Sequence, residues 1–75
     1  MFRLYKHSND YGWTLVNLIT NKNWICSDIK YLFWVMPLLK RNIGNINSQF
    51  DNTYIHICDF ETIENLQNRY PELFI

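Results

Sequence analysis

The chain has 75 residues, enough for one hydrophobic core and too few for two. Hydrophobic residues make up 48% and aromatic residues 17% of the sequence, a composition that excludes intrinsic disorder and predicts a fold without a disulfide framework. Seven basic residues balance seven acidic ones, so no net field steers the molecule onto nucleic acid or lets it imitate a phosphate backbone. The sequence therefore predicts a single compact domain over residues 1–75.

Three short strands are predicted in the N-terminal third. Phe2–Lys6 alternates apolar and basic residues, Trp13–Thr20 is rich in β-branched and aromatic residues, and Trp24–Cys26 resumes extended structure after a turn. A helix over residues 11–19 is the competing interpretation, because several apolar residues there fall at helical spacing. Gly12 and the nearby threonines weigh against it.

A helix is predicted from a cap at Ser27 or Asp28 to about Arg41, with a kink or a shortening at Pro37. Within it, the nine residues Tyr31–Leu39 are all apolar or aromatic. Crossing a bilayer takes about 20 apolar residues, so this run predicts no membrane span.

The rest of the chain predicts a β-hairpin followed by a helix. Ile46–Phe50 and Thr53–Cys58 are the two predicted strands, and Asp51-Asn52 suits the tight turn between them. Asp59 is the predicted cap of the last helix, which Pro71 should stop. The order strands, helix, β-hairpin, helix predicts an α+β fold, a small antiparallel sheet with two helices packed on one face.

His56 and Cys58 invite a catalytic interpretation, because a thiol beside a helix N-terminus can have a lowered pKa and a histidine lies two residues away. The sequence around them supplies no oxyanion site and no further motif. His7 and Cys26 complete a set of four possible zinc ligands, but no close cysteine pair of the structural-zinc kind is present. We therefore expect no catalytic residue, no metal site and no cofactor.

The apolar run is the most informative feature of the sequence. A helix that is apolar all round must be buried all round, whereas a two-layer domain of this size covers only one side of it. We therefore expect an interface with another protein at Tyr31, Phe33, Trp34 and Leu38. Complete coverage within one chain, by strands that wrap around a kink at Pro37, is the alternative.

A second docking face is predicted on the strand that ends at Cys58. Side chains alternate along a strand, which places Ile55 and Ile57 on one side and the other residues on the opposite side. The two isoleucines should belong to the core. We expect Tyr54 and His56 to extend the protein interface.

The alternative function is single-stranded nucleic-acid binding. Arg3, Tyr5, Lys6 and His7 bring basic and aromatic groups to the first predicted strand, where bases could stack. Basic residues also serve to protect an edge strand from aggregation. Because the net charge is zero and no RNA-binding motif is present, protein binding is the first prediction.

The predicted function is thus a small protein-binding module, with a homodimer as one form of partner. Asn, Ile, Tyr and Lys are abundant and are favoured by AT-rich codons, which suggests an inhibitor or adaptor encoded by a phage or mobile element and docked on a host protein. The N-terminal residues lack the apolar core of a signal peptide, and there are two cysteines. These features predict the reducing cytoplasm.

Overall fold

The computed structural model describes residues 1–7, 12–46 and 54–74. Its sheet has five strands in the order β4-β3-β2-β1-β5, and every neighbouring pair is antiparallel. The strands are β1 (Phe2–His7), β2 (Trp13–Asn17), β3 (Lys22–Cys26), β4 (Asn45–Ile46) and β5 (Tyr54–Phe60). The helices are α1 (Leu32–Lys40) and α2 (Ile63–Arg69), with 3-10 turns η1 (Ile29–Tyr31) and η2 (Pro71–Phe74). The predicted α+β fold is confirmed.

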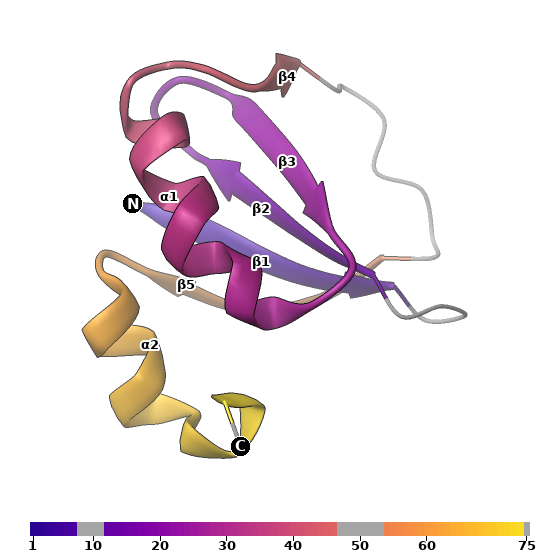
Figure 1. The fold of residues 1–75 in the computed structure, drawn as a ribbon, viewed down its shortest axis with the longest axis vertical. Helices are drawn as coiled ribbons and strands as arrows, with labels where there is room; N and C mark the ends of the chain where they lie inside the picture. The colour runs from indigo at the N-terminus through magenta and orange to yellow at the C-terminus, as the bar shows by residue number, and fades with distance from the viewer. Residues whose placement is uncertain (8–11, 47–53, 75) are drawn as a thin grey trace.

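The two helices lie on the same side of the sheet, where α1 crosses β2 and β3 and α2 flanks β5 (Figure 1). Leu4 and Leu15 are paired across β1 and β2, are both fully buried, and form the centre of the layer under α1. Leu66 of α2 and Phe60 of β5 belong to the same buried cluster. One continuous core therefore joins both helices to the sheet.

The first three strands form the predicted meander. β1 pairs with β2 from Phe2 opposite Asn17, and β2 pairs with β3 from Trp13 opposite Cys26. In the turn between β2 and β3, Asn21 has a φ of 61°, a left-handed conformation that asparagine tolerates better than most residues. The helical interpretation of residues 11–19 is wrong.

The predicted helix cap at Asp28 is confirmed, because its carboxylate accepts a hydrogen bond from the Lys30 backbone N–H at 2.9 Å. The element begins as η1 and continues as α1 to Lys40, with Arg41 at its C-cap. Pro37 lies inside α1 and neither ends nor splits it. After α1, Gly44 has a φ of 148°, and a Cβ there would lie 2.8 Å from a Leu39 methyl. Glycine is needed at that close approach.

The predicted β-hairpin is wrong. β4 pairs with β3 while β5 pairs with β1, so these two strands lie at opposite edges of the sheet (Figure 1). The predicted turn at Asp51-Asn52 lies outside the described residues. Of the expected strand Ile46–Phe50, Ile46 belongs to β4, which begins at Asn45, and residues 47–50 lie outside the described part of the chain.

The predicted cap of the last helix is also wrong. Asp59 is part of β5, and the side chain of Thr62 instead accepts a hydrogen bond from the Asn65 backbone N–H at 3.1 Å. The stop at Pro71 is confirmed, because α2 ends at Arg69 and the proline begins η2. Within the described part of the chain, no helix is long and apolar enough to cross a membrane.

Strand β5 buries different residues from those predicted. Ile55, expected in the core, is 51% exposed, whereas Cys58, expected on the face of His56, is 5% exposed and lies in the core. Ile57 is half-buried and packs against the core, as expected. Cys58 turns into the core because a register shift between β1 and β5 next to Tyr5 interrupts the alternation of side chains along β5. Ile55 lies before this shift, opposite Lys6, and is exposed near the start of the strand.

Candidate functional site

An apolar groove lies between β3 and α1. It encloses about 560 Å³, is open to solvent, and is lined by Trp24, Ile25, Cys26, Ser27, Tyr31, Trp34 and Val35. We call these seven residues the aromatic groove. Two of them, Tyr31 and Trp34, are residues that the sequence predicted for a protein interface.

The sequence of α1 explains why aromatic side chains reach the groove. Leu32, Val35, Met36 and Leu39 are buried against the sheet, at the spacing that places residues on one side of a helix. The remaining apolar residues of the run must then point outward, and Trp34 is 60% exposed. Tyr31, at the end of η1, is 53% exposed. An entirely apolar run thus produces an apolar outer surface.

The two tryptophans of the groove hold each other in place. The rings of Trp24 on β3 and Trp34 on α1 lie 5.8 Å apart between centroids, at an angle of 86°. This edge-to-face arrangement is favoured by the ring quadrupoles and contributes about 0.5–1.5 kcal/mol beyond burial. The Trp24–Trp34 contact therefore helps to fix the side chains that form this wall of the groove.

The other predicted interface residues do not join the groove. Phe33 lies on another side of α1, with its ring 6.0 Å from that of Phe74 between centroids, and it lines a smaller hollow between α1 and α2. Leu38 is half-buried. His56 is exposed on β5, an edge strand that β1 and β2 separate from β3. The side chain of Tyr54 lies outside the described part of the structure.

Sequence reasoning missed the contribution of β3 to the groove. Trp24 and Cys26 were assigned to a strand, and alternation could have placed their side chains together on one face. The sequence does not show that this face of β3 lies next to Trp34, because that depends on how α1 crosses the sheet. Ile25, at 53% exposure, carried no signal at all.

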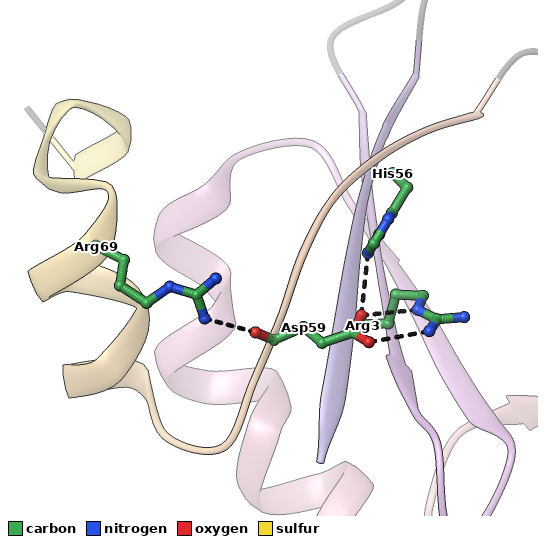
Figure 2. Close-up of polar contacts among 4 residues, drawn as sticks. All are labelled: Arg3, His56, Asp59 and Arg69. Atoms are coloured by element: carbon green, nitrogen blue, oxygen red, sulfur yellow. Dashed lines mark hydrogen bonds and ion pairs between the residues drawn. The ribbon is translucent and has the colours of Figure 1, made fainter.

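A polar cluster joins β1, β5 and α2 away from the groove (Figure 2). The Arg3 guanidinium donates to both carboxylate oxygens of Asp59, at 2.7 and 2.9 Å. Nε2 of His56 lies 3.0 Å from Asp59 Oδ1, and Arg69 donates to the Asp59 backbone carbonyl at 2.8 Å. Figure 2 shows Arg3 and His56 converging on one carboxylate while Arg69 reaches over from α2.

The charges of this cluster stabilise each other. The hydrogen bonds from Arg3, reinforced by His56, lower the pKa of Asp59 to about 2. The same contact with Asp59 raises the pKa of Arg3 above its ordinary value. Both side chains remain about one-third exposed, so solvent screening keeps the energetic effect small. The cluster is a structural connection between three elements.

The predicted nucleic-acid residues are divided between two faces of β1. Alternation puts Arg3, Tyr5 and His7 on one face and Lys6 on the other. Arg3 is bound to Asp59 as described, and the Tyr5 ring lies 5.8 Å from that of His56. The Lys6 ammonium lies 5.1 Å from the centre of the Trp13 ring. Arg3, Tyr5 and His7 thus share one face of β1, and Lys6 is the one residue of the four that lies on the other face.

The structure separates the Cys58 thiol from the His56 imidazole, the pair that the sequence suggested as catalytic. Cys58 is buried in the core, whereas His56 is exposed and contacts Asp59. Burial raises the pKa of the Cys58 thiol and raises that of Cys26 to about 11. Thiols with raised pKa values are weak nucleophiles at neutral pH. Among the described residues, no three His, Cys, Asp or Glu side chains come together as a metal site.

Comparison of the chain with protein families, with curated proteins and with solved structures finds no match.

Proposed function

We propose that this protein is a protein-binding module and that the aromatic groove is its docking surface. The observation that carries the proposal is the convergence of Trp24, Tyr31 and Trp34 on one open hollow, with two of the three side chains more than half exposed. Large exposed apolar groups that are grouped together mark interaction sites. Trp and Tyr are also the residues that most often dominate binding energy at protein interfaces.

Buried residues and a hydrogen bond hold the groove in a fixed shape. A groove of fixed shape is better suited to binding than exposed side chains that move freely. Val35 at its base is fully buried, and the neighbouring Leu39 is anchored by a hydrogen bond from the Asn17 side chain to its backbone carbonyl at 3.0 Å. The Trp24–Trp34 contact fixes the side chain that a partner would meet. Side chains already held in one conformation lose less entropy when they bind.

The biological setting that we propose is an inhibitor or adaptor of a phage or other mobile element, working in the cytoplasm of its host. In such a role the module acts by occupying a surface of another protein, and it carries out no chemistry of its own. The raised thiol pKa values of Cys26 and Cys58 agree with that role.

The test compares Trp34→Ala with Phe33→Ala. The two aromatic side chains are neighbours on α1 and are similarly exposed, at 60% and 52%, but only Trp34 lines the groove. Partner proteins captured from the native host by the immobilised chain should be recovered at least tenfold less well with Trp34→Ala, a loss of about 1.4 kcal/mol in a typical aromatic anchor. Phe33→Ala should retain them.

Thermal melting of both variants provides the control for folding. Each variant loses one aromatic pair, Trp24–Trp34 or Phe33–Phe74, worth about 0.5–1.5 kcal/mol, so the two melting temperatures should fall by a similar few degrees while both proteins stay folded. Equal recovery with wild type and Trp34→Ala, from proteins that melt alike, would show that the groove is not the docking surface.

A further inference from the structure

The hydrogen bonds between β1 and β2 determine to which side each residue of these strands directs its backbone N–H and C=O groups. The Leu18 N–H donates to the Met1 carbonyl at 3.0 Å, and the His7 N–H donates to the Gly12 carbonyl at 3.1 Å. In an antiparallel pair, residues that exchange hydrogen bonds alternate with residues that point away. The even-numbered residues of β2 therefore direct their backbone N–H and C=O groups to β1, and Trp13 and Leu15 direct theirs to β3.

The same alternation continues into β3. Trp13 is opposite Cys26 and Leu15 is opposite Trp24, so Trp24 and Cys26 direct their backbone groups to β2. The N–H and C=O of Ile25, which lies between them, point to the outer edge. Strand β4 pairs only with Lys22 and Asn23. Within the described ranges, no strand lies beside Ile25.

We infer that the aromatic groove binds an extended segment of a partner protein, which adds to the sheet as a strand beside Ile25. This inference rests on the proposed function and specifies its partner. An open sheet edge binds a peptide through backbone hydrogen bonds, while pockets select alternate side chains. Ile25 supplies one outward donor and acceptor, and the groove lies beside it on the side of Trp24.

The geometry of a strand connects the two features. Successive side chains of the added segment point to opposite faces of the sheet. The residue that exchanges hydrogen bonds with Ile25 points to the outer face, like the Ile25 side chain. The residues just before and just after it then point to the α1 face, where Trp24 and Trp34 lie. Apolar residues at those two positions should be preferred.

The size of the site favours a peptide over a second copy of the chain. Seven residues line the groove, whereas a standard protein interface uses about 20–30 residues on each side. A symmetric antiparallel pairing of two copies about Ile25 would also put Ser27 of one copy opposite Asn23 of the other. That position beside Asn23 is already taken by Asn45 of β4.

Two lysines that are close in sequence to groove residues favour acidic residues in the partner. Lys22 precedes Trp24 by two residues on the same face of β3, and Lys30 directly precedes Tyr31. Neither lysine forms an ion pair with any described residue. The nearest carboxylate in the sequence, that of Asp28, accepts the Lys30 backbone N–H. The expected segment is therefore extended, apolar at alternate positions and acidic at its ends.

The direct test is amide hydrogen exchange at Ile25. The probe is a linear twelve-residue peptide selected on the full chain from a random library. In the free protein the Ile25 amide should exchange quickly, and saturation with the peptide should slow it at least tenfold. The Trp24 amide, bonded to β2, is the internal control and should be protected in both states.

Other results of this measurement would overturn the inference. An Ile25 amide that is already protected in the free protein would mean that the edge is covered. Protection that grows with protein concentration without peptide would identify a second copy as the occupant. An Ile25 exchange rate that is unchanged on saturation with peptide would show that the peptide does not add to the sheet as a strand.

Variants separate this inference from the proposed function. Ile25→Pro removes the outward N–H without removing a bond to β2, and proline is tolerated at such edge positions. It should weaken peptide binding at least tenfold, whereas Ile25→Val, which keeps the N–H, should not. N-methylation of Ile25 in a synthetic 1–25 segment, ligated to 26–75 through Cys26, gives the same comparison with the side chain retained.

The combined outcome is decisive for each proposal. Loss of binding with Trp34→Ala but not with either Ile25 modification would reject strand addition and leave the groove as docking surface. Retention of binding with Trp34→Ala would reject the groove itself.

Discussion

Asn17 connects the sheet to α1 and should contribute more to the free energy of unfolding than an exposed polar residue does. It is 6% exposed, and its Nδ2 donates to the Leu39 carbonyl at 3.0 Å. Its Oδ1 accepts from the backbone N–H groups of Ile19 and Thr20, at 3.0 and 3.3 Å. At about 0.5–1.5 kcal/mol for each hydrogen bond, loss of the three gives roughly 1.5–4.5 kcal/mol.

The expected cost of Asn17→Ala lies in the lower half of that range. Ile19 is 82% exposed, so water can replace the bond to its N–H, and the Leu39 carbonyl also accepts from the Asn42 N–H at 3.2 Å. We expect the free energy of unfolding to fall by about 2 kcal/mol. Urea denaturation should show a lower midpoint with an unchanged slope.

Asn17→Asp tests the donor by itself. A carboxylate keeps the two acceptor contacts but faces the Leu39 carbonyl without a proton, so this variant should be less stable than Asn17→Ala at pH 7. Burial beside that oxygen raises the pKa of the introduced carboxyl. The variant should therefore regain stability as the pH falls through that raised pKa. An Asp variant as stable as wild type at pH 7 would refute the assigned hydrogen bond.

Three further outcomes follow from burial and charge. Leu32→Ala, at a fully buried position, should lower the free energy of unfolding by about 2–5 kcal/mol in urea titrations, and a loss below 1 kcal/mol would contradict the assigned core. The lowered pKa of Asp59, about 2, means that its stabilisation is present above its unfolded pKa and is lost as the pH falls toward 2. The effect should be about 0.2–1 kcal/mol, since both side chains of the pair with Arg3 are about one-third exposed and screened by solvent, and Asp59→Asn should abolish that pH dependence. Native Cys26, with a pKa of about 11, should react with iodoacetamide at pH 7.5 far more slowly than the unfolded chain, and equal rates would contradict its burial.

Local signals in the sequence predicted the elements that local forces specify. Asp28 caps a helix because a carboxylate beside free amide groups stabilises them wherever the chain goes. The N-terminal meander was found from alternation and turn residues, which act over a few positions. Pro71 ends α2 because a proline cannot continue the hydrogen-bond ladder.

Strand partners were beyond the reach of these signals. The turn-like Asp51-Asn52 pair suggested that the strands before and after it were neighbours, and consecutive strands usually are. In the structure β4 instead pairs with Lys22 and Asn23, and β5 pairs with β1. Which edge a strand joins depends on the whole sheet, and no single segment encodes it.

For a similar reason, the sequence predicted the residues that α1 and η1 contribute to the groove but not those that β3 contributes. Tyr31 and Trp34 follow from the apolar run, because a helix in a two-layer fold cannot bury every side. Trp24 and Ile25 could not be added without the crossing of α1 over β3. The open edge at Ile25 further requires knowing that β4 begins at Asn45, opposite Asn23.

One backbone irregularity accounts for the positions of Cys58 and Asp59 in β5. Leu4 is opposite Cys58 and Lys6 is opposite Ile55, so two residues of β5 stand opposite Tyr5 alone. Such a bulge resets the alternation, and Cys58 turns into the core while Asp59 turns outward. His56 and Asp59, three residues apart, would lie on opposite faces of a regular strand. The bulge puts both on the face of Arg3, so the residue predicted to cap a helix becomes the centre of the polar cluster.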